Sequence, residues 1–547
     1  MHKKVESRQQ LNISCLDDLV TIDNPVRLLS FLVDDVISKG NIELPTGKHV
    51  LGRGAYSAKD LVKLCLYGYI HGITSCRELD KAAKINIEVI WLIKGQTPSY
   101  KTIADFRKNN PLFIKQVFEK FIHLLIDEKL ITNDIWALDG YKVKGNAKRD
   151  MQSVKKLRKK VDAANEKIEQ LIRELEEDVE IISVEEVEAS SYTEDRESES
   201  KAAQLVKVTK DRDRMQSLIA EAESKDQNYI SETDKDALLV TTRRGKCAGY
   251  NTQVVVDSTN HFIVGAELAS VCNDTKSLYS AIKSTVNMTG NKPTTVLADR
   301  GYTNYQDIRK LYEEVTDGVR VTLQKSSREK EGLHFTYDSI NDQVICPQGK
   351  LMEYKGKQFD KGVFYYAYRC KECASCPVKT ECTKSQDGRV YRISENHEFI
   401  EMYKNLMKKE ESVKATKRRK TIVEHVFGTL GHMMHHNGFK LRGRLKVMTE
   451  LYLYSLAYNI KRLFNMDKRG HPSLYIGKLR LKCALSFLFL FLEWFFTIKE
   501  LIMRKTEAIC HHFDVNLPVN VLLADLGKSG EKRVFSQPLK PACHLFV

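Results

Sequence analysis

The sequence predicts an α/β fold, a mixed sheet flanked by helices, preceded by an all-α domain and interrupted by two insertions. Three observations support this prediction. Apolar runs that end in an acid at Asp139 and Asp299 are typical of buried strands. A charged stretch with heptad-like spacing separates these runs, and five cysteines gather between Cys346 and Cys382. A chain of 547 residues is long enough for several such units.

Residues 15–130 are predicted to form a compact helical domain. Apolar residues recur at helical spacing from residue 57 to residue 108, and Ser57, Thr74 and Ser75 are suitable helix starts. An ordinary helical bundle and a DNA-binding domain both fit this pattern. Basic residues near its end favour DNA binding: Lys101, Arg107 and Lys108.

Strand and helix signals alternate after this domain. Strands are expected at 135–140, 249–258, 261–270, 294–302 and 319–324, with helices at 274–288 and 304–315. The second and third strands are separated by a short polar turn, which predicts an antiparallel pair. The sheet is therefore assigned to residues 131–150 and 231–465.

Residues 151–230 are predicted to form a coiled-coil-like helical hairpin inserted into the sheet domain. Polar residues 189–200 separate two charged helical stretches. Pairing with a second subunit and a solvated intramolecular hairpin both fit the pattern. The first stretch carries an apolar stripe with steps of three and four: Leu157, Val161, Ala164, Ile168, Leu171, Leu175 and Val179.

The charge of the chain is unevenly distributed. Its formal net charge is +15, but residues 161–225 hold 19 acidic and 9 basic residues, so the remainder carries +25. Residues 414–446 contain nine Lys or Arg and a single acid, Glu424. A basic body of this kind predicts a polyanionic partner.

Asp139, Asp299 and Glu424 are the candidate metal ligands. The two aspartates follow apolar runs, where the carboxyl edge of a sheet exposes its functional side chains, and Glu424 lies in a partly apolar helix. Three acids can bind two Mg²⁺ ions, which catalyse phosphoryl transfer when roughly 3.5–4 Å apart. Considered singly, each of these acids would be interpreted as a helix cap or a turn residue. Asp257, Asp274 and Asp307 are interpreted as a turn acid, a helix cap and a surface acid.

The motifs ALDGYKVKGNA, VLADRGY and VEHVFG, in this order, resemble those of the DDE transposases of bacterial insertion sequences. The segments GRGAYSAKDLVKLCLYGYIHGI and LYLYSLAYNIKRL resemble that family's N-terminal domain and last core helix, so the resemblance covers about residues 15–465. It implies an RNase H-like core, a helical DNA-binding domain, and Asp139, Asp299 and Glu424 as the catalytic triad. It also implies Mg²⁺ or Mn²⁺, cleavage and joining of double-stranded DNA at transposon ends, and a homodimer on that DNA.

The chain departs from the family pattern around the glutamate. Related transposases carry Tyr, Arg, Glu and Lys where this chain has Lys417, Lys420, Glu424 and Gly431. Lys420 keeps the charge but lacks the planar fork of arginine. Gly431 supplies no cation, but a neighbouring cation can take the place of the missing one: Arg442, Arg444 or Lys446. A catalytically impaired DNA-binding protein and a metal-dependent nuclease therefore remain as alternatives.

Seven basic residues are candidate contacts to DNA phosphates, with a solvated surface as the alternative for each. Arg418, Arg419 and Lys420 lie one turn before Glu424, and the others flank the first motif or follow the glutamate helix: Lys142, Lys144, Arg442 and Arg444. The cluster of His432, His435 and His436 is interpreted as a DNA-facing or surface helix end.

The cysteines predict a zinc site and a reducing compartment. Thirteen cysteines are too sparse for a disulfide scaffold, and the opening residues contain no apolar core of a secretory signal, so a cytoplasmic, nucleoid-associated protein is expected. Residues 340–390 form a Cys-rich insertion of a kind that the family resemblance includes. Overlapping C-x-x-C spacings favour structural Zn²⁺ bound by four of five thiolates: Cys346, Cys370, Cys373, Cys376 and Cys382.

Residues 466–547 form a tail of unknown role. Its apolar stretch, 483–503, is interrupted by Glu493 after about ten residues, short of the roughly 20 that span a bilayer. No membrane partner is expected.

Overall fold

The computed structural model describes residues 15–45, 54–147, 151–184, 194–242, 244–323, 334–360, 362–434 and 437–468, with Gly477 and Leu481; side chains of 178–199 and 467–468 lie outside the description. The chain divides into two units, Met1–Val20 with Leu32–Pro472, and Thr21–Phe31 with Ser473–Val547. The predicted tail falls almost entirely outside the described residues. Apart from residues 25–31, the first part of α1, the fold and the site described below belong to the first unit.

A helical N-terminal region is present, as predicted. Ser57 and Ser75 precede the second and third α-helices, as expected. Asn86 and Ser99 cap the next two with their side chains. The helices are α1 (Pro25–Lys39), α2 (Ala58–Ile70), α3 (Cys76–Ile85), α4 (Ile87–Leu92), α5 (Tyr100–Asn109) and α6 (Pro111–Asp127), after a 3₁₀ turn η1 (Leu16–Leu19).

Arg107 is an internal residue of this region, so its expected place on a DNA-facing surface is wrong. Its side chain is 3% exposed and donates to the Tyr69 hydroxyl and to the Thr74 carbonyl. The guanidinium thus fastens α5 to α2 and to the turn before α3. Lys101 and Lys108, in contrast, are exposed.

The central sheet is mixed, as predicted. Its strand order is β4-β5-β1-β7-β8, and the sixth strand, β6, also pairs with β5. β5 runs antiparallel to β1, β4 and β6, whereas β1, β7 and β8 are parallel. The strands are β1 (Ile135–Lys144), β4 (Leu238–Thr242), β5 (Gly245–Asp257), β6 (Ile263–Leu268), β7 (Thr295–Ala298) and β8 (Gly318–Val321).

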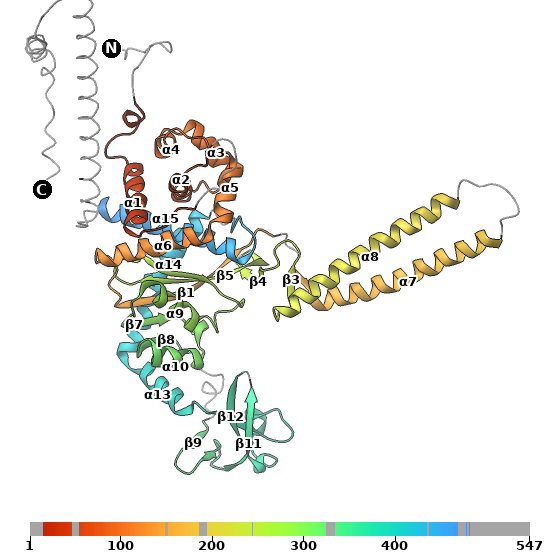
Figure 1. Ribbon diagram of the computed structural model, residues 1–547. Helices are drawn as coiled ribbons and strands as arrows, with labels where there is room; N and C mark the ends of the chain where they lie inside the picture. Colours follow the sequence, from red (N-terminus) through yellow and green to blue (C-terminus); the bar gives the residue numbers. More distant parts are fainter. Residues whose placement is uncertain are drawn as a thin grey trace, which may run out of the picture. The chain divides into compact units, whose positions relative to one another are not determined.

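Helices flank this sheet (Figure 1). They are α9 (Leu278–Thr289), α10 (Tyr305–Glu314), α13 (His397–Lys408), α14 (Glu410–Met433) and α15 (Arg444–Lys468). The buried helix α15 packs on α2, α5 and α6 as well as on β6. Its Asn459 accepts from the backbone N–H of Ile263 and donates to the same residue's carbonyl, which satisfies the edge of β6.

The segment between β1 and β4 contains two long helices, α7 (Val154–Val184) and α8 (Glu194–Ser224), which lie side by side (Figure 1). Short strands β2 (Met151–Ser153) and β3 (Tyr229–Ser231) pair at their base. Leu157, Leu218 and Ile230 form a buried cluster there. Of the predicted apolar stripe, Leu157, Val161 and Leu171 are buried, and Val179 is outside the described side chains.

The Cys-rich segment forms a second, antiparallel sheet, which the sequence did not predict. Its order is β13-β12-β11-β10-β9, with a small core around Val344, Tyr368 and Ile393. The strands are β9 (Thr336–Asp338), β10 (Gln343–Ile345), β11 (Leu351–Asp360), β12 (Val363–Arg369) and β13 (Val390–Ser394). The short helices η3 (Lys371–Cys373) and α12 (Lys379–Cys382) lie between the last two strands.

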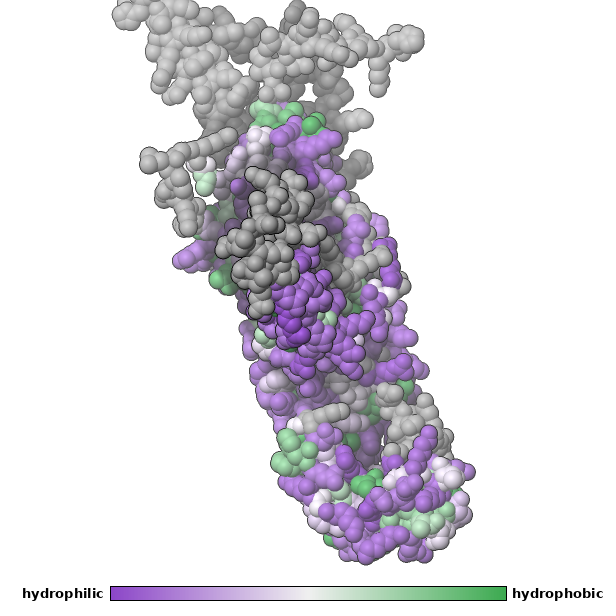
Figure 2. Space-filling view, turned by 90° about the vertical axis from the view of Figure 1, so that its right-hand side faces the viewer, coloured by the Kyte–Doolittle hydropathy of each residue, from purple (hydrophilic) through white to green (hydrophobic). Residues whose placement is uncertain are grey.

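The surface in Figure 2 is mostly hydrophilic, with small separate hydrophobic areas. Across the described ranges, no helix is both long and apolar enough to cross a bilayer. The apolar stretch 483–503 lies outside those ranges.

Candidate active site

Asp139 lies in the middle of β1, between β5 and β7. Its Oδ1 accepts from the backbone N–H of Gly140 at 2.9 Å, and its Oδ2 accepts from Arg419 Nη1 at 2.6 Å. Burial raises the pKa of Asp139 above its usual value, Arg419 opposes that rise, and the charge of Asp299 adds to it. The carboxylate is therefore held firmly in surroundings that disfavour its negative charge.

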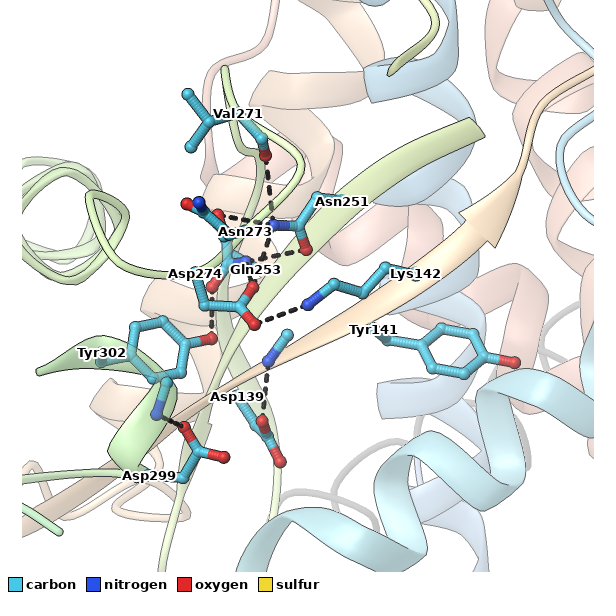
Figure 3. Close-up of polar contacts among 12 residues, drawn as sticks. Asp139, Tyr141, Lys142, Asn251, Gln253, Val271, Asn273, Asp274, Asp299 and Tyr302 are labelled. Atoms are coloured by element: carbon cyan, nitrogen blue, oxygen red, sulfur yellow. Dashed lines mark hydrogen bonds and ion pairs between the residues drawn. The ribbon is translucent and has the colours of Figure 1, made fainter. Parts of the chain in front are cut away.

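Asp299 follows β7 directly and caps the short helix η2 (Arg300–Tyr302). Its Oδ1 accepts from the backbone N–H of Gly301 at 2.7 Å. β1 and β7 are parallel with Ala137 opposite Leu297, so the two aspartates, each two residues further along, reach neighbouring positions of the sheet. Figure 3 shows both carboxylates at this place.

A polar network beside these aspartates was not predicted. Asp274 Oδ1 accepts from Asn251 Nδ2 at 2.9 Å and from Gln253 Nε2 at 3.0 Å, and its Oδ2 accepts from Lys142 Nζ at 2.5 Å. The hydroxyl of buried Tyr302 donates to Gln253 Oε1 (Figure 3). The network links β1, β5 and the residues after β7 into one polar unit.

The interpretation of Asp274 as a helix cap is wrong, because α9 begins four residues later, after Ser277. Asp307 is not a simple surface acid either, since its Oδ2 is buried and burial raises the pKa of its carboxyl. Asp257 is a turn acid as expected: its Oδ2 accepts from the backbone N–H groups of Thr259 and Asn260.

Glu424 lies on α14, which packs against β1, β5, β7 and β8. The buried Val423 and Val426 place the helix on the sheet, and Phe427 stacks on Tyr141 of β1. Glu424 itself is exposed and, within the part of the chain that the structure describes, forms no hydrogen bond or ion pair. The structure therefore places the helix of Glu424 against the sheet that carries the two aspartates, but the Glu424 carboxylate makes no contact with either of them.

Two of the expected DNA-binding cations are engaged inside the chain. Arg419 is 8% exposed and forms the ion pair with Asp139, and Lys142 is paired with Asp274. Two more donate to backbone carbonyls: Arg442 Nε to Asn146, and Arg444 to Leu268 and Ala269. These four side chains hold the site and its surroundings together, so their contacts to DNA remain predictions.

Three other expected cations lie on the surface: Lys144, Arg418 and Lys420. His432 lines a cavity beside the end of α14. His435 and His436 lie outside the described residues.

The five cysteines of the Cys-rich sheet surround one cavity of about 220 Å³. Cys346 Sγ accepts from the backbone N–H of Lys350 at 3.4 Å, and Cys373 Sγ accepts from that of Arg389 at 3.5 Å. Burial raises the pKa of the Cys370 thiol to about 11. The thiols thus face a shared space with backbone donors directed at two of them.

No group of three or more His, Cys, Asp or Glu side chains among the described residues is arranged to hold a metal ion as the structure stands. The donor chemistry nevertheless fits a hard cation. Asp139 and Asp299 offer carboxylate oxygens at adjacent positions, and the charge of Asp299 raises the cost of the charge on Asp139. A divalent cation would offset that cost.

Comparisons with known families find two matches. The family described as "Transposase DDE domain" matches residues 345–464, and "Transposase domain (DUF772)" matches residues 14–109. The first match includes Glu424 and the five cysteines, whereas Asp139 and Asp299 precede it. No curated protein matches the chain. Among solved structures, the piggyBac transposase synaptic complex with hairpin DNA aligns at 11% identity and a TM-score of 0.27, over 89% of this chain and 84% of that one.

Proposed function

We propose that this protein cuts the ends of an insertion sequence and joins them to target DNA. The chain carries a DDE transposase domain, which implies a polynucleotidyl transferase. The observation that carries the proposal is that Asp139 lies on β1 and Asp299 directly follows β7, the parallel neighbour of β1. The sheet, its helices and the acids then act as an RNase H-like catalytic core. The matched N-terminal helices are proposed to bind the element's ends.

Asp139, Asp299 and Glu424 are the residues that we propose to hold Mg²⁺ or Mn²⁺. Such ions, when bound, activate a water or a 3′-hydroxyl and stabilise the leaving oxygen at phosphorus. Asp139 and Asp299 are fixed by backbone N–H donors, so little reorganisation of these carboxylates is needed. Glu424 is supplied from α14, and the Arg419–Asp139 ion pair holds that helix against β1.

The exposed cations Lys144, Arg418 and Lys420 are proposed to bind DNA phosphates around this site. Lys142, Arg419, Arg442 and Arg444 are proposed to act mainly by holding the elements that carry the acids, given their contacts within the chain. A homodimer on DNA is proposed because two ends must be processed together. The expected location is the cytoplasm, on the nucleoid.

A structural Zn²⁺ in the Cys-rich sheet is part of the proposal. Four of the five cysteines around the 220 Å³ cavity would bind it, and the backbone donors to Cys346 and Cys373 are of the kind that stabilise thiolates. The site would fix the turns between short strands, because so small a sheet buries little apolar surface.

Labelled DNA carrying the element's ends, incubated with the protein and Mg²⁺, tests the proposal. We expect nicks at the ends and joining of the ends to a second duplex, both abolished by EDTA. Binding without nicking would identify a DNA-binding protein without activity, which the burial of Arg419 against Asp139 favours as the second candidate. Nicking without joining would identify a nuclease.

A further inference from the structure

A cavity of about 490 Å³ lies between the C-terminal halves of α14 and α15. Among the residues that the structure describes, no carboxylate lines it. Its polar lining residues are His425, Thr429 and His432 from α14, and Tyr458, Lys461, Arg462 and Asn465 from α15. The cavity therefore presents cations and hydrogen-bonding groups of neutral side chains, without an internal counter-charge.

Its two cations have no acidic partner within the described part of the chain. Lys461 forms neither a hydrogen bond nor an ion pair there, and Arg462 uses Nε to donate to the Asn260 carbonyl at 2.9 Å. Cations near a helix C-terminus can serve the helix dipole, but that effect is confined to the last turn. Lys461 and Arg462 lie about two turns before the end of α15 at Lys468, so the dipole does not account for them.

His425, on the α14 side of the cavity, lies against a second histidine. His425 Nε2 and His261 Nδ1 are 3.1 Å apart, and the Tyr458 hydroxyl donates to the His261 carbonyl at 3.1 Å. Burial lowers the pKa of both rings, that of His261 to about 4, which disfavours a positive charge on either ring. The positive field of the cavity comes from Lys461 and Arg462.

We infer that this cavity binds a backbone phosphate of DNA, next to the strand that the proposed active site would cut. The inference rests on the proposed function. Along α14, His425 is six residues beyond Arg419, the residue that touches Asp139, which is about 9 Å at 1.5 Å per residue. A few base-pair steps of a duplex span a distance of this order, so the phosphate held here would belong to the DNA around the reacting one.

Titration of labelled duplex DNA at several salt concentrations, without divalent metal, tests the inference. We expect Lys461→Gln to weaken binding about fivefold and to reduce the slope of log affinity against log salt by about one, with Lys461→Arg close to wild type. Lys283→Gln is the matched control, because it removes one charge from an exposed lysine on α9 that is paired with Glu314. Each variant should melt as the wild type does.

An unchanged affinity and salt slope for Lys461→Gln, with wild type binding DNA normally, would overturn the inference and leave the proposed function standing. The inference would also be overturned, with the proposed function still standing, if inorganic phosphate stabilised the wild type through Lys461 but DNA affinity did not depend on Lys461. Wild type that does not bind DNA at all would overturn both.

Discussion

Arg419 Nη1 donates to Asp139 Oδ2 at 2.6 Å, so a cation of α14 is bound to a strand carboxylate that the proposed chemistry requires. The same helix carries Glu424, five residues later. The ion pair thereby couples the placement of the third acid to the position of the first.

Arg419→Ala should destabilise the protein by about 2–3 kcal/mol. The substitution leaves the mostly buried Asp139 carboxylate without its cation, and loss of one partner of a fully buried pair costs about 3–5 kcal/mol. Urea unfolding measures the change. Lys414→Ala on the same helix breaks an exposed pair with Glu410 and should cost about 0.5 kcal/mol or less. Equal losses for the two variants would refute a structural role of the Arg419 pair.

Asp139→Asn should be more stable than wild type at pH 7, although inactive, because asparagine buries no negative charge and its side-chain oxygen can still accept from Arg419. The raised pKa means that the folded state holds the Asp139 proton more tightly than the unfolded chain does. This contribution is present below the unfolded pKa of about 4 and is lost as pH rises through the folded pKa. Asparagine does not ionise, so the variant does not lose this stability as pH rises, and its side-chain oxygen can still accept a hydrogen bond from Arg419.

Thermal melting of both forms from pH 3 to pH 8 checks this prediction. The two melting temperatures should converge near pH 3 and separate as pH rises. A wild type that melts higher than Asp139→Asn at pH 7 would contradict it.

Gly140→Ala should disrupt the Asp274 network. A Cβ at this position would lie 2.6 Å from Asp274 Oδ1 and 3.0 Å from Gln253 Nε2, so the network must shift, at a cost of about 1–3 kcal/mol. Strand cleavage should fall with it. Gly54→Ala is the control and should be close to neutral, because no atom of the described residues lies within 4 Å of the added Cβ. The two measurements are urea unfolding and DNA nicking, and a Gly140→Ala protein that matches the control in both would show that the network is dispensable.

Freshly purified protein should contain about one zinc per chain. Removal of that zinc by a chelator should lower the melting temperature of the Cys-rich sheet, because the metal would supplement its small apolar core. Single Cys→Ser variants at the five positions, assayed for zinc, should identify one thiol whose loss changes nothing. Zinc well below stoichiometry in the wild type would remove the proposal.

The strands and the two aspartates could be predicted from sequence. A strand that is buried on both faces consists of apolar residues, and the first polar residue after them marks the place where the chain leaves the core. Asp139 and Asp299 mark that point on β1 and beside β7. The helix signals around Ser57 and Ser75 were equally local.

The Asp274 network could not be predicted because it depends on pairing register. Gly140 lies opposite Gln253 and Lys142 opposite Asn251 only once β1 is aligned with β5. The alternating polar residues Asn251 and Gln253, within an otherwise apolar strand, were the one local signal. The antiparallel sheet around the cysteines gave none, since its strands are either short, as β10 is, or mostly exposed, as β11 is.

Strand cleavage of end-containing DNA in Mg²⁺ by Asp139→Asn, Asp299→Asn and Glu424→Gln tests the central claim most directly. DNA binding is measured on the same preparations, and Asp317→Asn, an exposed acid beside β8, is the control. We predict that each of the three variants binds DNA but cleaves at least about 1,000-fold more slowly, whereas the control cleaves normally. Cleavage at the wild-type rate by any one of the three would contradict its place in the catalytic triad.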